Sequence, residues 1–337
     1  MAPTRSHLHR QLHDNLRDSP RVLLATHERA DGDALGSLIA LQEHFRRGGT
    51  SVLALAPDSS PKIFSFLSGI DSLRTDVSGI DVSAFDAVLL LDSGDVRRTQ
   101  LAEKLYFLGT QRPLVALIDH HRPALSWRDR NLVDLAIVDT ARSSTCELVY
   151  EFFVANGLDF SPEQATALLT GIITDTGGFV NAGTTLESMD IAAELLRRGG
   201  NLRRIVSATV RSKSVASLQL WGRALSRLER DPATDTISTA LMLKDFDECG
   251  VDREGSEGIA NFLNSLGEGR VVLVLREEPD GLVKGSYRTK RSGVDVAALA
   301  RVYGGGGHTK AAGFTVAGEI VQDERGWRVR EKARTKI

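Results

Sequence analysis

The first half of the chain contains runs rich in apolar residues that lack the polar alternation of a half-exposed strand. The runs are Val22–Ala25, Ser51–Ala56, Phe85–Leu91, Leu114–Ile118 and Leu168–Ile173. Such runs, separated by segments with helical spacing, are typical of a parallel sheet that helices cover on both faces. The last run also has the spacing of a helix end, so both interpretations stay open there. We therefore predict an α/β domain over residues 1–200.

The pattern changes near Asp231. Polar and apolar residues then alternate over Thr236–Leu243, as in a strand with one exposed face, and Pro279-Asp280-Gly281 is a strong turn signal further on. These features predict a smaller α+β domain over residues 231–337. The stretch before it has helical spacing and many Arg and Lys residues, so we expect a helical linker over residues 201–230.

Ionisable side chains follow several of the apolar runs. They are His27, Asp31 and Asp33 after the first run, Asp92 after the third, Asp119, His120 and His121 after the fourth, and Asp175 after the last. The carboxyl ends of parallel strands meet at one edge of a sheet, where ligands gather. Asp31 and Asp33 are two positions apart, so in extended backbone both side chains leave the same side. A helix cap would account for Asp33 but not for the whole set.

The side-chain chemistry of this set predicts a metal site. The candidate ligands are His27, Asp31, Asp33, Asp92, His120 and Asp175. Imidazole and carboxylate without thiolate suit Mn²⁺, Mg²⁺ or Fe²⁺ better than a structural zinc site. Four carboxylates would be neutralised by two divalent cations, which in two-metal sites lie roughly 3.5–4 Å apart and activate a water. Such a site suits the hydrolysis of phosphate esters or anhydrides.

Two residues beside the expected ligands are candidates for the proton chemistry. His121 follows His120 and is not expected to point the same way, so it would face the substrate and hold a phosphate or protonate the leaving oxygen. Asp119 could be a ligand, but orienting a neighbouring imidazole is the more usual role of such a carboxylate. The candidate catalytic residues are therefore His121, Asp92 and Asp119.

Candidate substrate-binding residues lie in both expected domains. They are Ser143, Ser144, Arg288, Gly305, Gly306, Gly307 and His308. The two serines open a helical pattern, where hydroxyls either cap the helix or bind an anion with the free N–H groups. The glycines would let the backbone approach an anion, with the N–H groups of a following helix aimed at it, although glycines also mark helix ends. Arg288 suits a fork-like contact with phosphate or a base edge.

Composition narrows the class of protein. The net charge of −2 over 337 residues excludes a protein that holds long nucleic acid by bulk charge. Cys146 and Cys249 have no paired spacing, as expected in a reducing cytoplasm. No apolar run approaches the ~20 residues that a membrane span needs. The stretch with His7, His9 and His13 favours a solvated helix face over a metal site, and the basic residues after Gly318 favour a solvated tail.

Together the motifs resemble those of the DHH phosphoesterase family, named for the triplet that is Asp119-His120-His121 here. The segment His27-x-x-x-Asp31-Gly-Asp33-x-x-Gly-Ser, Asp92 after its strand and Asp175 in Thr-Asp-Thr-Gly match the other family motifs. The glycine run with His308-x-x-Ala-Ala-Gly resembles the signature of the DHH-associated C-terminal domain. The resemblance covers nearly the whole chain.

Within the family, length and architecture are similar to the bacterial nanoRNase/pAp-phosphatase branch. Those proteins use Mn²⁺ to degrade oligoribonucleotides of a few residues and to dephosphorylate 3′-phosphoadenosine 5′-phosphate (pAp). The resemblance implies that His27, Asp31 and Asp92 hold one metal ion, and that Asp33, Asp92, His120 and Asp175 hold the second. It also implies that His121 contacts the scissile phosphate, while Ser143, Ser144, Arg288, the glycine loop and His308 hold the nucleotide.

Other functions stay open at this point. The same metal site would serve an enzyme for linear or cyclic dinucleotides, such as pGpG or c-di-AMP, and the sequence does not separate these substrates. A nucleotide sensor without catalysis is a different class, against which the complete ligand set argues. A short substrate needs few phosphate contacts, which agrees with the low net charge. The oligomeric state stays open, with a homodimer among the expectations.

Overall fold

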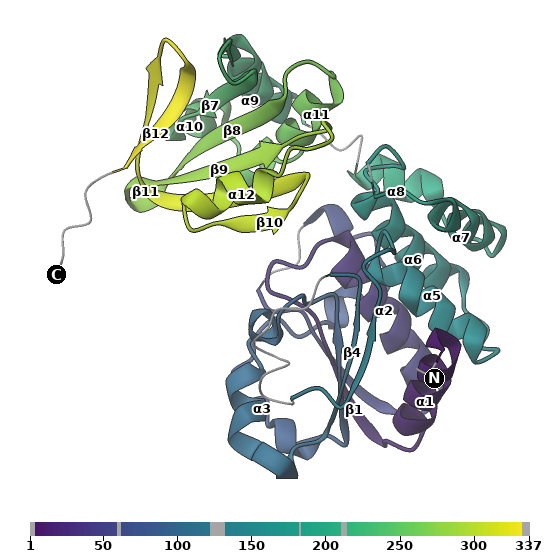
Figure 1. Ribbon diagram of the computed structural model, residues 1–337. Helices are drawn as coiled ribbons and strands as arrows, with labels where there is room; N and C mark the ends of the chain where they lie inside the picture. Colours follow the sequence, from purple (N-terminus) through teal and green to yellow (C-terminus); the bar gives the residue numbers. More distant parts are fainter. Residues whose placement is uncertain (1–3, 59–61, 122–131, 182, 210–213, 332–337) are drawn as a thin grey trace. The chain divides into compact units, whose positions relative to one another are not determined.

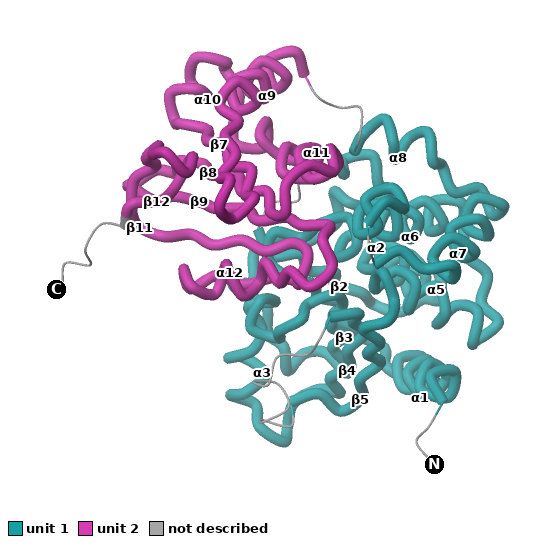
Figure 2. Tube along the Cα trace, turned by 45° about the horizontal axis from the view of Figure 1, so that its top comes forward, with its two compact units in different colours: residues 1–212 teal, residues 213–337 magenta. Residues whose placement is uncertain are grey.

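The computed structural model describes residues 4–58, 62–121, 132–181, 183–209 and 214–331. The chain divides into two compact units, residues 1–212 and residues 213–337 (Figure 2). The stretch predicted to be a helical linker contributes to both units. Helix α8 (Leu202–Thr209) belongs to the first unit, and helix α9 (Val215–Ser226) belongs to the second.

Five parallel strands form the sheet of the first unit, in the order β2-β1-β3-β4-β5. Their bounds are β1 Arg21–Ala25, β2 Ser51–Leu55, β3 Ala87–Leu91, β4 Leu114–Asp119 and β5 Leu135–Val138. Leu24 of β1 is in register with Ala54 of β2 and Leu89 of β3. Strand β3 is buried along its whole length, as its unbroken apolar sequence predicts. The predicted parallel sheet is confirmed.

Helices cover both faces of this sheet (Figure 1). Their bounds are α1 Arg5–Arg17, α2 Gly32–Arg47, α3 Ala102–Leu108, α5 Thr145–Ala155, α6 Pro162–Asp175 and α7 Leu186–Arg197. Successive residues of β1 point to opposite faces, so Leu24 packs with α1, α2, α5 and α6, and Leu23 packs with α3. Both side chains are fully buried.

The apolar run Leu168–Ile173 is helical, so its interpretation as a strand is wrong and the alternative is confirmed. Ser161 caps α6 through a reciprocal capping box with Gln164, and Pro162 occupies the first helical position. Both are start signals of helices. Asp175 is therefore delivered by the C-terminal end of a helix and not by a strand.

The second unit has a mixed sheet in the order β10-β11-β9-β8-β7-β6, and β12 pairs with β11. Its strands are β6 Glu229–Asp231, β7 Thr236–Leu241, β8 Val271–Glu278, β9 Leu282–Arg288, β10 Gly306–His308, β11 Ala311–Asp323 and β12 Gly326–Glu331. Helix α12 (Val296–Val302) packs on one face, and α9, α10 (Leu243–Cys249) and α11 (Ile259–Ser265) pack on the other. The predicted α+β class is confirmed.

Two expectations about charged flanks are wrong. His9 is buried, because α1 packs its ring against Phe152 of α5, whereas His7 is exposed. The stretch after Gly318 forms the β11–β12 hairpin up to residue 331, and Trp327 anchors it by donating its indole N–H to the carbonyl oxygen of Arg227. Lys332, Arg334 and Lys336 lie outside the described residues. Within the described part of the chain, no helix combines the length and the apolar character that a membrane crossing requires.

Candidate metal centre

The six predicted ligands meet at the carboxyl edge of the first sheet. Among the described residues, three groups of possible ligand atoms lie within 4.8 Å of one another. The groups are His27, Asp31 and Asp92; Asp33, His120 and Asp175; and Asp92, His120 and His121. The first group is one ligand set that the family resemblance implies, and the second group is the other set without Asp92. They come from the ends of β1, β3 and β4, the start of α2 and the end of α6.

Asp92 lies between the two groups. Its Oδ2 is 3.7 Å from Nε2 of His27, and its Oδ1 is 3.6 Å from Nε2 of His120. Nε2 of His27 is also 3.9 Å from Asp31 Oδ2, and Nε2 of His120 is 3.3 Å from Asp175 Oδ2. One oxygen of Asp92 thus faces each group, which is the arrangement of a ligand shared by two cations.

Both imidazoles, of His27 and His120, turn Nε2 toward the carboxylates. Nδ1 of His27 is 2.7 Å from the carbonyl oxygen of Glu28, and Nδ1 of His120 is 3.3 Å from that of Arg142. A carbonyl only accepts, so each Nδ1 carries a proton. The Nε2 atoms are left to face the carboxylates, as in metal-ligating histidines whose other nitrogen donates to a fixed acceptor.

Asp31 and Asp33 do not lie together in extended backbone as predicted, because α2 begins at Gly32 between them. Asp31, not Asp33, is the N-cap of α2 and accepts from the N–H groups of Asp33 and Ala34. Asp33 lies in the first helical turn, fully buried, and accepts from the backbone N–H groups of Thr145 and Cys146 at 2.6 and 2.8 Å. The free backbone N–H groups at the start of α5, which could bind an anion, are therefore occupied by the carboxylate of Asp33.

The serines before α5 have structural partners. The Ser144 hydroxyl is fully buried and accepts from the N–H of Glu147, as an N-cap does. The Ser143 hydroxyl donates to the Glu147 carboxylate. This geometry favours the capping interpretation, and contact of either serine with a nucleotide stays a prediction. Sequence reasoning missed the next residue, Thr145, whose hydroxyl donates to Asp92 Oδ1 at 3.0 Å.

His121 does point toward the ligands, so the expectation that it diverges from His120 is wrong. Its Nδ1 lies 2.9 Å from Asp119 Oδ1 and 3.2 Å from Asp92 Oδ1. Asp119 also accepts from the backbone N–H of Gly94, so it is fixed from two sides. Burial lowers the pKa of His121, but hydrogen bonds and charge from Asp119 and Asp92 raise it to about 11. In the metal-free protein these contacts favour the protonated ring.

The carboxylates repel one another in the metal-free protein. Burial and the neighbouring carboxylates raise the pKa of Asp33, and burial raises the pKa of Asp175 to about 6. Burial lowers the pKa of His120, but Asp175, Asp33 and Asp92 raise it to about 9. Two divalent cations would relieve this repulsion and displace the proton from His120. The donor set therefore fits hard divalent cations.

We expect the metal-free protein to lose stability as the pH rises from about 4 to about 9. Raised carboxyl pKa values mean that the folded Asp33 and Asp175 bind more protons than the unfolded chain, so their contribution to stability is present at low pH and lost as the pH rises. For Asp175 this loss is centred on its folded pKa of about 6. His120 contributes in the same direction, because it also binds more protons in the folded state. Its contribution to stability is lost between its unfolded pKa of 6.5 and its folded pKa of about 9. Urea unfolding across this range checks the trend. Mn²⁺ should flatten it, and Asp175→Asn should weaken its acid half.

Two of the predicted residues of the second unit, Arg288 and His308, lie in one row of its sheet. His308 of β10 is opposite Ala311 of β11, and Ala311 is opposite Arg288 of β9. Residues directly opposite share a face, so Arg288 and His308 flank a small residue roughly 10 Å apart. Nε of Arg288 donates to Asn261 Oδ1. The glycine run leads into strands and not into the expected helix, because Gly306 pairs with Gly313.

The centre has a basic neighbour that sequence reasoning did not single out. The guanidinium of Arg98 lies 3.0 Å from Nδ1 of His27, and its Nη1 is 3.5 Å from the carbonyl oxygen of Ser93. That Nδ1 already donates its proton to the carbonyl oxygen of Glu28, so it cannot also accept a hydrogen bond from the Arg98 guanidinium. In the sequence, only its position six residues after Asp92 could have drawn attention to Arg98.

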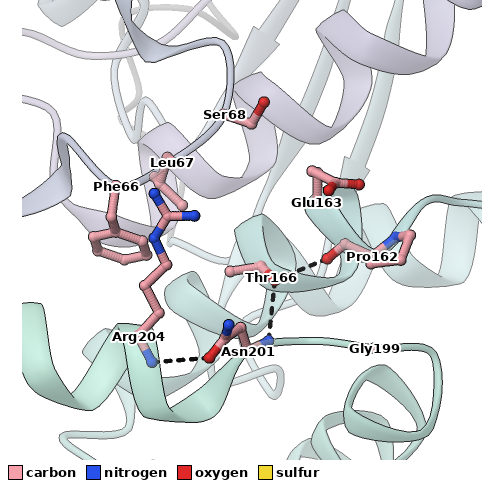
Figure 3. A pocket seen from close by; sticks show the side chains of 9 residues that line it. All are labelled: Phe66, Leu67, Ser68, Pro162, Glu163, Thr166, Gly199, Asn201 and Arg204. Atoms are coloured by element: carbon pink, nitrogen blue, oxygen red, sulfur yellow. Dashed lines mark hydrogen bonds between the residues drawn. The ribbon is translucent and has the colours of Figure 1, made fainter.

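A separate hollow of about 160 Å³ lies at the start of α8 (Figure 3). Phe66, Glu163 and Arg204 line it, and Asn201 joins its floor to Thr166 by a backbone N–H···Oγ1 hydrogen bond of 3.0 Å. It opens beside the N-terminal end of α6, roughly 20 Å along that helix from Asp175. The hollow is therefore not part of the metal centre.

The fold and the centre define a class of protein. A model of the DHH family N-terminal domain matches residues 21–172, and a model of the DHHA1 domain matches residues 239–330. The chain belongs to the DHH family and is an enzyme of the phosphoesterase class, as its motifs indicate.

Similar proteins refine this class. The chain is 30% identical over 318 residues to the bifunctional oligoribonuclease and PAP phosphatase NrnA of Thermus thermophilus, covering 94% of this chain and 90% of that protein. It is 24% identical to the NrnA protein of Bacillus subtilis, covering 88% and 89%. The crystal structure of an exopolyphosphatase-related protein from Bacteroides fragilis has the same fold, with a TM-score of 0.83, 23% identity and coverage of 91% and 90%.

Proposed function

We propose that this protein hydrolyses short oligoribonucleotides to mononucleotides and pAp to AMP and phosphate, with two divalent cations, preferably Mn²⁺. The names of the relatives that match most of the chain support this substrate class. The observation that carries the proposal is the placement of Asp92, with one carboxylate oxygen toward His27 and the other toward His120. We also propose a cytoplasmic location, which two free cysteines suit.

Different residues of the first unit would bind the cations and assist the reaction. His27, Asp31 and Asp92 would hold one cation, and Asp33, Asp92, His120 and Asp175 the other. Bound cations would offset charge on the phosphate and lower the pKa of a water. His121, kept protonated by Asp119 and Asp92, is placed to stabilise the phosphate or to protonate the leaving oxygen.

Residues on the second unit would bind the nucleotide. Arg288 is buried enough to lower its pKa, and its hydrogen bonds go to Asn261 and to the carbonyl oxygen of Tyr287. A guanidinium held this way keeps further N–H groups for a phosphate or a base edge. His308 and the exposed Gly306 and Gly307 lie in the same part of the sheet.

The test is Mn²⁺-dependent turnover of four substrates: pAp, a 5′-phosphorylated RNA dimer, linear pGpG and a long single strand. We expect fast turnover of pAp and the RNA dimer and slow turnover of the long strand. A strong preference for pGpG would favour the dinucleotide phosphodiesterase. Nucleotide binding without turnover of any substrate would favour the sensor and contradict the proposal.

A further inference from the structure

Helix α1 and the loop between β5 and α5 share a network of charged side chains that the chemistry above does not use. The network joins Arg5 and His9 of α1 to Asp139, Arg142, Glu147 and Glu151. The Glu147 side chain is fully buried, and those of Arg142 and Glu151 are 16% and 21% exposed. Removing one partner of such a buried ion pair is costly, because the other charge is left without compensation.

Arg142 is the centre of this network. Its Nη2 lies 2.7 Å from Glu151 Oε1, its Nη1 3.6 Å from Glu147 Oε2, and its Nε 3.8 Å from Asp139 Oδ2. One carboxylate comes from the start of the loop and two come from α5. The guanidinium therefore fixes the backbone of its own residue from three directions.

The backbone of Arg142 contacts the metal centre. Its carbonyl oxygen accepts from Nδ1 of His120 at 3.3 Å, and this contact leaves Nε2 of His120 to face Asp33, Asp92 and Asp175. The side chain and the carbonyl of one residue thus link the charged network to a candidate ligand.

Helix α1 supports the network from outside. Arg5 pairs with both Asp139 and Glu151, the outer partners of Arg142, and Nε of Arg5 lies 2.7 Å from Glu151 Oε2. His9, fully buried on the next turn, has Nε2 3.6 Å from the same oxygen. The first helix of the chain is in this way connected to the ligand His120.

We propose that Arg142 is a positioning residue that sets the orientation of His120, and that α1 supports it through Glu151. This inference rests on the proposed two-metal site. Partners that orient a metal ligand cost about 10–100-fold in metal affinity when removed. Removing the guanidinium should therefore weaken one of the two cation sites and spare the site at His27.

The experiment is a titration of the metal-free full chain with Mn²⁺. Calorimetry measures the affinity of each site, and electron paramagnetic resonance reports whether the bound ions are spin-coupled. For Arg142→Met we expect one site weakened about tenfold or more, the other unchanged, and the signal of a spin-coupled pair replaced by that of isolated Mn²⁺ at limiting metal. Arg142→Lys should restore part of the affinity, and Glu151→Gln should act in the same direction. Arg112→Met is the matched control, because it removes an ion pair with Asp134 that joins the residues before β4 to those before β5, away from His120.

Two results would overturn the inference, and they are distinguishable. If Arg142→Met and Glu151→Gln both keep the two affinities of the control, Arg142 does not position His120, and the proposed function stands. If the unaltered chain binds no pair of Mn²⁺ ions, the proposed function fails together with the inference. Circular dichroism of each metal-free variant confirms that the fold is retained.

Discussion

Asp92→Asn is expected to abolish turnover while the protein stays folded. Asparagine keeps the shape of the side chain and, like aspartate, tolerates the left-handed backbone found at this position, where φ is 52°. It replaces one of the two anionic oxygens that face His27 and His120. Loss of an outer partner costs about 10–100-fold, so loss of the shared ligand should cost more. Steady-state rates on pAp at saturating Mn²⁺ measure the loss.

Asp95→Asn is the control for this substitution. Asp95 lies in the same loop, but its carboxylate caps the following turn and pairs with Arg97. Asparagine is an equally good cap, so the rate should stay near that of the unaltered protein. Asp92→Asn activity within threefold of this control would contradict the role of Asp92.

His121→Gln is expected to lower kcat by about 10²–10⁴-fold, the range for loss of a general acid. Glutamine retains hydrogen bonding but cannot carry the proton that Asp119 and Asp92 hold on the ring. Rates on the RNA dimer measure the effect, and His7→Gln on the exposed face of α1 is the control.

A nucleotide ester of p-nitrophenol separates the two roles of His121. This leaving group needs no proton, so the defect of His121→Gln should shrink toward unity if the ring is the acid. An equal defect on both substrates would instead assign His121 to binding of the phosphate. No defect on either substrate would remove it from the chemistry.

The sequence predicts the elements that a single chemical pattern defines. Unbroken apolar runs give the parallel strands, and the ionisable residues after them meet at one edge, as the distances around Asp92 show. Capping signals at Ser161 and Pro162 decide for a helix where hydrophobicity alone is ambiguous. Strand β5 was not predicted, although its four residues, Leu135–Val138, form an unbroken apolar run of the same kind.

Contacts between distant segments are beyond sequence reasoning. The spacing of Asp31 and Asp33 does not reveal that α2 begins between them, so that one caps the helix and the other is buried against α5. The sequence also does not show which way the side chains of two adjacent histidines point. Here a hydrogen bond with Asp119 holds the His121 ring close to Asp92. The network around Arg142 depends on how α1 packs on α5, which no local pattern encodes.

A crystal structure of the Mn²⁺-loaded protein, with anomalous scattering recorded at the manganese edge, tests the central claim most directly. We expect two peaks in the first unit, one beside Nε2 of His27 and one beside Nε2 of His120, with Asp92 between them. A single peak, or two peaks that do not share Asp92, would contradict the two-metal centre.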